Sequence, residues 1–370
     1  METISRRELA YGLAASALLP LAALPIAAAR AAERDPAWQV LPTVPYKGKQ
    51  DDIYFIDGDR GWYGNGAGRV YGTTDGGRSW ALLWEKPGTY VRALGFVDAK
   101  VGILGNIGVD YFPGVTDANP LYRTVDGGKT WQAVTQVTGP TPKGICAIDI
   151  LRRPFINAGV LNQRTTIRAG GRVGGPAHLM TSHDDGVSWT SEDLGAVTGA
   201  ILDIHFVNER VGYIAGAGES DVETSNAVIL RTLDGGATWR RVYRSTRPFE
   251  IIWKLNFPTP RVGYATIQNY NPDTRESQRR VARTSDGGAT WHELPLADDH
   301  ALQEFGIGFI DEHRGWVGGS PHGYETRDGG RHWQPADMGR ATNKVRIVAT
   351  PQGRRVFAIG VDVRRLDLDR

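Results

Sequence analysis

Acidic pairs are the first residues of this chain that could perform chemistry. Asp51 and Asp52 stand side by side, and Asp298, Asp299 and Glu304 form a second acidic group. Two carboxylates that face each other across a cleft can hydrolyse a glycosidic bond. Short acidic pairs more commonly cap turns through backbone hydrogen bonds. We favour the capping role and keep a glycoside hydrolase as the alternative function.

Metal and redox chemistry have little support in the sequence. The chain has one cysteine, Cys146, which excludes an intramolecular disulfide and a cysteine-based metal cluster. The eight histidines show no metal-ligand spacing, and Asp298-Asp299-His300 is unspecific. We therefore expect no metal and no other cofactor. The formal net charge of +2 gives no argument for nucleic acid as a partner.

A second acidic pattern repeats along the chain and indicates structure instead of catalysis. An aspartate is followed by one or two glycines, one variable residue, a Ser, Thr or His, and a Trp. The six aspartates are Asp75, Asp126, Asp185, Asp234, Asp286 and Asp328. The carboxylate can accept backbone N–H groups and close a turn, and the glycines allow positive φ. We interpret all six as structural turns.

The repeated turns imply an array of similar units. Upstream of most turns lies a Phe-x-Asp segment followed by a glycine and an aromatic residue, as in Phe55-Ile-Asp57 and Gly61-Trp62. Each repeat then reads as four short strands, and units of this length are typical of propeller blades. Seven first-strand candidates can be counted, the first at 52–56 and the last at 345–349. The sequence thus predicts an all-β, seven-bladed β-propeller over residues 36–370, with four antiparallel strands per blade.

The two chain ends complete the last blade in this prediction. The last repeat stops after residues 363–368 without a repeated turn or a fourth strand. Trp38–Leu41, near the start of the propeller, matches the strands that follow the other turns. We expect Trp38–Leu41 to pair antiparallel with 363–368, which removes an exposed sheet edge.

The N-terminus reads as an export signal. Ser5-Arg6-Arg7 precedes an Ala-rich apolar stretch, and Ala29-Arg30-Ala31 offers small residues for cleavage. The adjacent arginines resemble the twin-arginine signal. Residues 1–31 are therefore predicted to be cleaved. The mature protein is expected in the periplasm, or in the thylakoid lumen of a photosynthetic organism.

Taken together, these repeats resemble the Asp-box, or bacterial neuraminidase repeat, and the whole mature chain resembles the photosystem II stability/assembly factor family of propellers. The resemblance implies a non-catalytic, exported binding protein. Its partner would be a protein client such as a membrane-protein subunit, with no nucleic acid and no small-molecule substrate. We expect a monomer. The client is left open, because the motifs specify the fold and not the function.

The lengths of the loops favour one face of the propeller for binding. The segment between the second-strand glycine and the turn aspartate is about ten residues longer in blades 2 to 5 than in blades 1 and 6. Clustered insertions often mark a binding face, and Arg and aromatic side chains are common interface anchors. The residues predicted to bind on this face are Tyr111, Phe112, Arg164, Arg168, Arg172, Tyr270, Arg275, Arg279 and Arg280.

The rival prediction is an enzyme, because sialidases and some endoglucanases also carry Asp-boxes. A retaining sialidase needs an arginine triad, a tyrosine nucleophile and a glutamate. The Arg-Ile-Pro signature of that family is missing from this sequence, and Arg152-Arg153-Pro154-Phe155 does not match it. We therefore predict that the protein is not an enzyme.

Overall fold

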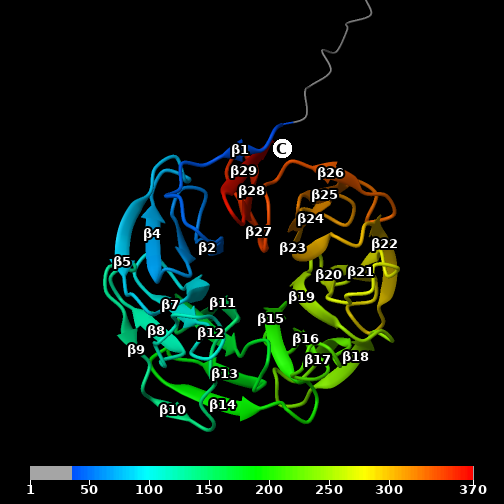
Figure 1. Cartoon of the computed structure of the whole chain (residues 1–370). Helices are drawn as coiled ribbons and strands as arrows, with labels where there is room; N and C mark the ends of the chain where they lie inside the picture. Colours follow the sequence, from blue (N-terminus) through cyan, green and yellow to red (C-terminus); the bar gives the residue numbers. More distant parts are fainter. Residues whose placement is uncertain (1–35, 370) are drawn as a thin grey trace, which may run out of the picture. The chain divides into compact units, whose positions relative to one another are not determined.

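The computed structural model describes residues 36–369, so the predicted export signal at 1–31 lies outside the described residues. Pro36–Arg370 is one compact unit. Within residues 36–369 there are 29 β-strands in seven sheets. The sheets follow one another around a ring, as Figure 1 shows. The seven sheets fit the seven predicted blades. No helix of the described part is long and apolar enough to cross a membrane.

The first three sheets contain the N-terminal half of the propeller. Sheet 1 is β2 (Gln50–Phe55), β3 (Gly61–Asn65), β4 (Arg69–Thr73) and β5 (Ala81–Glu85). Sheet 2 is β6 (Val91–Phe96), β7 (Gly102–Asn106), β8 (Leu121–Thr124) and β9 (Gln132–Ala133). Sheet 3 is β11 (Ala147–Asn157), β12 (Val160–Gly170), β13 (His178–Ser182), β14 (Trp189–Asp193) and β10 (Val137–Thr138).

The last four sheets follow the same order. Sheet 4 is β15 (Ala200–Phe206), β16 (Gly212–Ala217), β17 (Ala227–Thr232) and β18 (Arg240–Arg244). Sheet 5 is β19 (Glu250–Asn256), β20 (Gly263–Asn269), β21 (Gln278–Thr284) and β22 (His292–Asp298). Sheet 6 is β23 (Gln303–Phe309), β24 (Gly315–Ser320), β25 (Gly323–Thr326) and β26 (Gln334–Ala336). Sheet 7 is β27 (Lys344–Ala349), β28 (Gly353–Ile359), β29 (Val363–Asp369) and β1 (Gln39–Val40).

Sheet 7 joins the two ends of the described chain. β1 pairs antiparallel with β29, with Gln39 opposite Arg365 and Val40 opposite Arg364, which confirms the predicted pairing. Leu41 is buried, and the Trp38 ring packs edge-on against Trp316 at 5.9 Å. Sheet 7 also contacts sheet 1 directly, because Asn343 Nδ2 donates to the Asp51 carbonyl at 2.7 Å.

The prediction of four antiparallel strands per blade is wrong for sheet 3. Its fifth strand, β10, lies parallel to β14. Its first two strands are 11 residues each, the longest in the described part of the chain, and they form an extended hairpin.

The Phe and Gly of the upstream repeat are fixed by packing within each blade. The Phe55 ring lies against the Cα of Gly61, so that a Cβ there would come within 2.5 Å of a ring carbon. The same contact recurs between Phe96 and Gly102. Only glycine leaves room for the ring, which explains the spacing of the repeat.

Neighbouring sheets are joined by stacked rings. Trp62 of β3 stacks on Phe96 of the next sheet at 3.6 Å, and Tyr213 of β16 stacks on Phe257 at 4.2 Å. Trp62 and Tyr213 each also donate a hydrogen bond to a carbonyl of the repeated turn in the next sheet. Trp62 Nε1 donates to Gly127 at 2.9 Å, and the Tyr213 hydroxyl donates to Gly287 at 2.6 Å. The repeat therefore encodes contacts between blades as well as within them.

The repeated turns have the predicted structural role. In the first turn, Asp75 Oδ1 accepts the Thr73 hydroxyl at 2.8 Å and the Ser79 N–H at 2.9 Å. Asp75 Oδ2 accepts the Ser79 hydroxyl at 2.6 Å. These hydrogen bonds favour the ionised carboxylate and hold its pKa below the usual range. Asp126, Asp234, Asp286 and Asp328 accept equivalent bonds.

One of the six predicted turn aspartates is wrong. In sheet 3 the bonds are accepted by Asp184 and not by Asp185, since the Ser182 and Ser188 hydroxyls donate to Asp184 at 2.8 and 2.6 Å. Asp185 takes the place of the first glycine and has a φ of 56°. The sequence held the signal for this alignment, because the turn aspartate precedes the tryptophan by five residues in the other repeats and Asp185 precedes Trp189 by four.

The connections between strands define two faces. Consecutive antiparallel strands send their connections to opposite faces in alternation. We call the side with the six repeated turns and the first-to-second-strand hairpins the turn face. The opposite side, with the second-to-third-strand loops, is the loop face.

Candidate functional site

The second-to-third-strand loops of the loop face are longest on four adjacent sheets. These loops are 107–120 in sheet 2, 171–177 in sheet 3, 218–226 in sheet 4 and 270–277 in sheet 5. The corresponding gaps in the other three sheets are 66–68, 321–322 and 360–362. The predicted clustering of longer loops on sheets 2 to 5 is therefore present, but in sheet 3 most of the extra residues lie in the hairpin β11–β12 and not in this loop.

Loop 107–120 is fixed from below by a buried carboxylate. Asp117 Oδ2 accepts the Thr89 and Tyr122 hydroxyls at 2.5 and 2.6 Å and lies 3.0 Å from Lys86 Nζ. Burial opposes the charge, but these donors outweigh it and lower the pKa of Asp117 to about 2. Asp117 thus anchors the loop to the strands that flank it.

Two aromatic rings at the tip of this loop, Tyr111 and Phe112, pack together with Tyr90 from the connection before β6. Phe112 stacks on Tyr90 at 4.9 Å and meets Tyr111 edge-on at 4.6 Å. Phe112 is 42% exposed. The Arg172 guanidinium lies 5.4 Å from the Tyr111 ring, a cation–π distance. Predicted residues from loops 107–120 and 171–177 are therefore brought together.

Tyr270 joins this group from the far side of the ring. It is 38% exposed, and the Tyr111 hydroxyl is near enough to contribute to its raised pKa, after burial. Arg92 acts electrostatically on both tyrosines, so Tyr111 of sheet 2 and Tyr270 of sheet 5 share the influence of one buried cation. We call Tyr90, Tyr111, Phe112, Arg172 and Tyr270 the mouth cluster.

Beneath the mouth cluster, buried side chains span the centre of the ring. The Arg92 guanidinium of β6 lies 5.0 Å from the Trp253 ring of β19, and its Nη1 donates to Asp51 Oδ1 at 2.7 Å. Lys49 Nζ lies 4.7 Å from the Phe305 ring. Burial lowers the pKa of Lys49 to about 8. A layer of packed aromatic rings and cations therefore lies beneath the mouth cluster.

Arg172 and Arg279 are on the loop face but act inside the fold. Arg172 Nη1 donates to the carbonyls of Ile107 and Val109 at 3.2 and 2.7 Å. Arg279 is buried, and it donates to the carbonyls of Glu276, His300 and Leu302. The prediction of Arg279 as an accessible binding residue is wrong, because its guanidinium is consumed in holding loop 270–277 and residues 300–302.

Arg275 and Arg280 differ in exposure. Arg275 is exposed and forms an ion pair with Asp273 at 2.5 Å. Arg280 is half-buried in β21, and its Nε lies 3.5 Å from Glu293 Oε2 of the outer strand. Arg275 is thus open to a partner, whereas Arg280 sits within its own sheet.

The prediction that Arg168 binds on the loop face is wrong. Arg168 occupies the β12 position that Trp62 and Tyr213 occupy in their sheets. Its guanidinium stacks on Phe206 at 3.4 Å, and its Nη2 donates to the Gly235 carbonyl at 3.2 Å. It therefore replaces the usual aromatic contact between blades.

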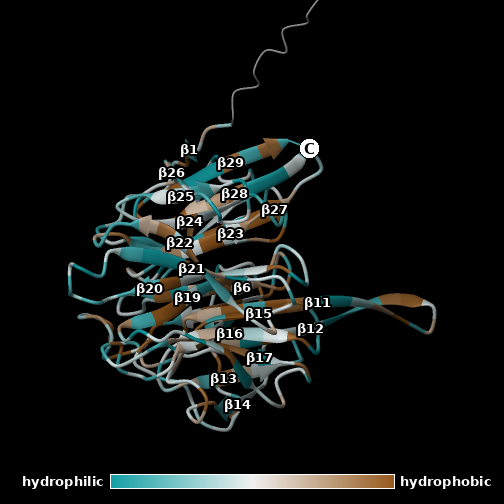
Figure 2. Cartoon of the chain, turned by 90° about the vertical axis from the view of Figure 1, so that its right-hand side faces the viewer, coloured by the Kyte–Doolittle hydropathy of each residue, from teal (hydrophilic) through white to brown (hydrophobic). Residues whose placement is uncertain are grey.

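Arg164 is also misplaced by the sequence prediction. The extra residues of blade 3 lie mainly in the hairpin β11–β12, whose tip joins Asn157 to Val160. That hairpin projects from the turn face, on the opposite side from the loops (Figure 2). The number of residues between the second-strand glycine and the turn aspartate does not show how long the strands are. The prediction therefore places the extra residues of blade 3 in the second-to-third-strand loop, whereas they lie mainly in the hairpin β11–β12.

The acidic pairs considered as candidate catalysts are held by structural contacts in the fold. Asp51 is buried against Arg92, and Asp52 is buried between Lys344 and Arg346. Burial works to raise the pKa of Asp52, but the two cations outweigh it and lower that pKa. Asp298 accepts the Ser277 hydroxyl, and Asp299 caps residues 301–302. The preferred reading of these carboxylates as structural groups agrees with their contacts.

Glu304 is the exception among these acids. It is buried, and its nearest cation is Arg279 at 3.9 Å. Burial raises its pKa well above the usual value, although Arg279 opposes the shift.

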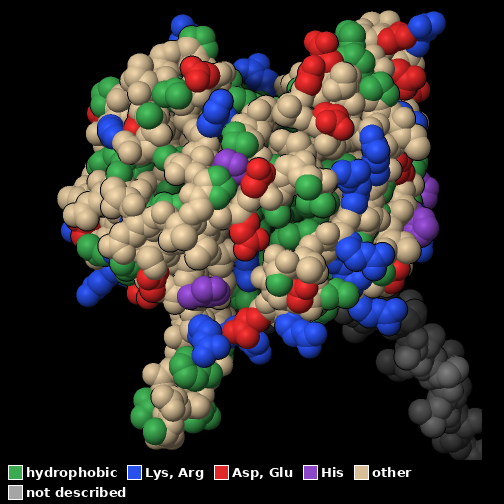
Figure 3. Space-filling model, turned by 90° about the horizontal axis from the view of Figure 1, so that it is seen from below, with side chains coloured by type: hydrophobic (Ala, Val, Ile, Leu, Met, Phe, Trp, Pro, Cys, Tyr) green, Lys and Arg blue, Asp and Glu red, His purple; other side chains and the backbone are tan. Residues whose placement is uncertain are grey.

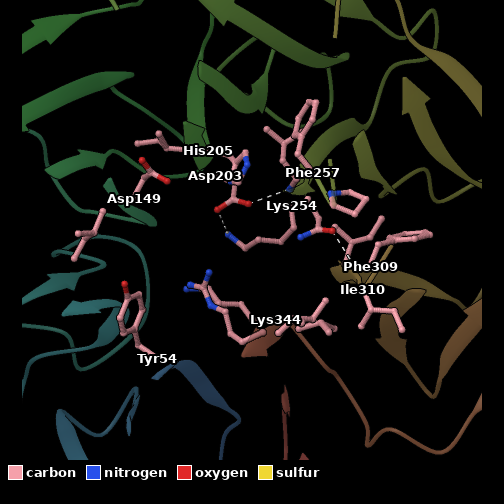
Figure 4. A pocket seen from close by; sticks show the side chains of 18 of the residues that line it. Tyr54, Asp149, Asp203, His205, Lys254, Phe257, Phe309, Ile310 and Lys344 are labelled. Atoms are coloured by element: carbon pink, nitrogen blue, oxygen red, sulfur yellow. Dashed lines mark hydrogen bonds and ion pairs between the residues drawn. The ribbon is translucent and has the colours of Figure 1, made fainter. Parts of the chain in front are cut away.

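A cavity of about 500 Å³ occupies the centre of the ring toward the turn face. It is lined by the ends of the first strands, and Figure 4 shows Asp149, Asp203 and Lys254 from three adjacent sheets pointing into it. Lys254 Nζ donates to the Leu202 carbonyl at 2.7 Å and lies 3.4 Å from Asp203 Oδ1. Asp149, Asp203 and Lys254 are not among the site residues predicted from the sequence.

Asp149 is the least compensated carboxylate of the cavity. Its Oδ2 is buried and has no hydrogen-bond partner. Burial raises the pKa of Asp149 to about 7, although Arg168 opposes the shift. A signal was present in the sequence, because charged residues interrupt otherwise apolar first strands, as in Ile148-Asp149-Ile150 and Leu202-Asp203-Ile204.

The described residues contain no group of three or more His, Cys, Asp or Glu side chains placed to hold a metal ion. The propeller has two candidate sites, an aromatic and cationic surface on the loop face and a charged cavity toward the turn face. The first suits the binding of a polypeptide, and the second has the carboxylates that an acid–base mechanism would need.

Comparison with known proteins supports the fold. No protein-family model matches the chain, and no curated protein matches it either. Among solved structures, YCF48 bound to D1 peptide superposes with a TM-score of 0.60 at 16% identity, covering 90% of this chain and 98% of that chain. YCF48 from Cyanidioschyzon merolae gives 0.59 at 17% identity over 89% and 98%.

An enzyme superposes equally well. The crystal structure of an ancestral GH74 enzyme gives a TM-score of 0.59 at 14% identity, and covers 88% of this chain but 45% of that chain. At these identities the likeness shows the β-propeller fold alone.

Proposed function

We propose that this protein is a non-catalytic propeller that binds an extended segment of a client protein on its loop face. The observation that carries the proposal is the mouth cluster, in which Phe112 of sheet 2 and Tyr270 of sheet 5 are both exposed on the loop face. Large rings at the centre of a surface, on a platform that is already ordered, are what protein interfaces use as anchors.

The similarity to YCF48 supports a peptide as the ligand, because that propeller has been solved with D1 peptide bound. A client that is a membrane-protein subunit would fit the predicted export signal at 1–31. We propose a periplasmic or lumenal monomer that assists the assembly of such a client.

A screen with a phage-displayed random peptide library tests this function. Wild-type protein should enrich a family of peptides, and the F112A/Y270A variant should lose at least about tenfold in affinity for them. Leu82→Ala is a matched control, since Leu82 is an apolar side chain 51% exposed on an outer strand. Equal peptide binding by F112A/Y270A and wild type would contradict the assignment of the site.

A glycoside hydrolase remains the second candidate, and Asp149 is the observation that favours it. A carboxylic acid with a pKa of about 7 beside the carboxylate of Asp203, in one cavity, is a pattern seen in acid–base catalysis. The superposition with the GH74 enzyme is consistent with it. Hydrolysis of any member of a glycoside panel that disappears in Asp149→Asn would replace our proposal with this one.

A further inference from the structure

The hairpin β11–β12 is the one part of the described chain that leaves the ring. From Arg152 to Asn157 and from Val160 to Arg164, every residue is exposed. Six residues at about 3.3 Å each place the tip roughly 20 Å from the sheet it belongs to. Figure 2 shows this projection from the side.

The tip is apolar on both faces of the ribbon. Ile156 and Leu161 pair across the two strands and are 74% and 72% exposed. Phe155 is 39% exposed and Val160 is 61% exposed. Successive residues of a strand point to opposite faces, so Phe155 and Ile156 present apolar groups in opposite directions. A groove in another protein would cover one face, whereas immersion in an apolar medium covers both.

A cationic collar lies just below the apolar tip. Arg153 of β11 stands directly opposite Arg164 of β12, and residues 152–164 include three arginines and no acidic residue. Like charges in opposed positions repel each other. Arg153 has one counter-charge at the root, Glu209 at 3.0 Å, and Arg164 lies 5.5 Å from the Phe155 ring. Figure 3 shows Lys and Arg side chains around the root of the projection.

The turn face near the hairpin is also more apolar than elsewhere. The exposed side chains of Val125, Val187 and Leu233 stand on the repeated turns of sheets 2, 3 and 4. The residue directly before the turn aspartate is Val125 in sheet 2 and Leu233 in sheet 4, but His183 in sheet 3 and Thr74, Ser285 and Arg327 in sheets 1, 5 and 6. Val187 lies three residues after Asp184. Sheet 3 carries the hairpin, so the apolar residues flank its root.

We propose that the hairpin inserts its tip into the interfacial layer of an anionic lipid membrane. Ile156, Leu161, Phe155 and Val160 enter the boundary of the acyl chains, and Arg153 and Arg164 reach the phosphate groups with their apolar stems beside them. Lipid phosphates between the opposed arginines relieve their repulsion. The membrane then faces the turn face, and the loop face stays open to a client on the other side.

Flotation with lipid vesicles tests the proposal on the intact protein. Vesicles of phosphatidylcholine mixed equally with phosphatidylglycerol should carry the wild type, and vesicles of phosphatidylcholine alone should carry much less. I156S/L161S should lose at least about tenfold in binding. R153Q/R164Q should lose the preference for anionic lipid and the sensitivity to salt. Leu82→Ser, which changes an apolar side chain 51% exposed on sheet 1, should bind as wild type.

A fluorescence reporter checks insertion directly. An I156W variant should show a blue-shifted emission on addition of anionic vesicles, because the indole leaves water. An unshifted emission with bound vesicles would show that the tip stays in water and would overturn the proposal.

Three other outcomes would overturn it as well. These are no vesicle binding by the wild type, equal binding by I156S/L161S, and capture of a protein through the tip without lipid. The proposal is independent of the proposed function, since I156S/L161S should still bind peptides selected on the loop face.

Discussion

The two faces of this propeller are built on opposite plans. The turn face repeats one device, in which an aspartate closes a turn and a ring or guanidinium from the preceding blade bonds to it. The loop face repeats nothing, and its four long connections differ in length, charge and anchoring. On the turn face the aspartates of the repeated turns and the side chains that bond to those turns serve the fold. On the loop face Phe112 and Tyr270 are left exposed.

The difference shows where function should be sought in a repeat protein. A residue that recurs in every unit is explained by the unit, and one that breaks the pattern requires a separate explanation. Arg168 breaks the pattern in type but keeps its contacts, so it remains structural. The hairpin tip breaks the pattern and has no contact that explains it.

Both faces depend on the sheet that joins the chain ends, so its loss should have the largest effect. Removing residues 36–44 deletes β1, exposes the edge of β29 and takes away buried Leu41 and the Trp38–Trp316 contact. We expect a loss of about 3 kcal/mol or more in unfolding free energy, with aggregation. Chemical denaturation and light scattering would measure it. Unchanged stability would show that β1 is dispensable.

Loss of a single turn aspartate should lower the unfolding free energy by less, and in sheet 3 this should hold for Asp184 and not for Asp185. Asp184→Ala removes the acceptor of four donors in sheet 3 and should cost about 1–2 kcal/mol. Asp185→Gly restores the glycine of the other turns at a position with positive φ, and should be neutral or slightly stabilising. The reverse order of the two unfolding free energies would restore Asp185 as the turn acceptor.

The cost of Asp184→Ala should also depend on pH. Hydrogen bonds to the carboxylate, against the effect of burial, lower the pKa of Asp184 to about 2. A lowered pKa gives stability that is present above the unfolded value near 4 and is lost as pH falls through about 2. The wild type and D184A should therefore converge in acid. A constant difference down to about pH 2 would contradict this.

A smaller effect on stability is expected from Asp149 in the central cavity. Burial raises the pKa of Asp149 to about 7, so the folded state resists its ionisation and wild-type stability falls as pH rises from about 4 to 7. Asp149→Asn removes that penalty and keeps an oxygen for the Phe206 N–H. It should stabilise the protein by about 1 kcal/mol at about pH 8 and have little effect near pH 4. Thermal unfolding at both pH values decides, and destabilisation at high pH would refute the assignment.

The fold could be predicted from the sequence because its determinants are local. Asp75 with its glycines, and Phe55 with Gly61, fix turns and strand pairs within a few residues, and they recur. The prediction of β1 against β29 needed only a count of strands. The site was harder, because burial depends on neighbours far apart in the chain. Nothing local distinguishes Arg279, which holds three carbonyls, from exposed Arg275.

The cavity shows the same limit. Asp149, Asp203 and Lys254 each interrupt an apolar strand, but only the ring arrangement brings three strands to one centre. The length of β11 and β12 could not be predicted from the number of residues between the second-strand glycine and the turn aspartate, because that number does not separate strand from loop. Ala158-Gly159, where both residues have positive φ, was the one local indication of a hairpin turn inside this insertion.

The most direct test of the central claim, that the loop face binds and the repeated turns only support, is amide hydrogen exchange with and without a peptide selected from the library. We predict slower exchange in 107–120, 171–177 and 270–277 on binding, and no change in the six turns that contain Asp75, Asp126, Asp184, Asp234, Asp286 and Asp328. Slower exchange confined to those turns or to the hairpin, with the loop face unchanged, would contradict the account.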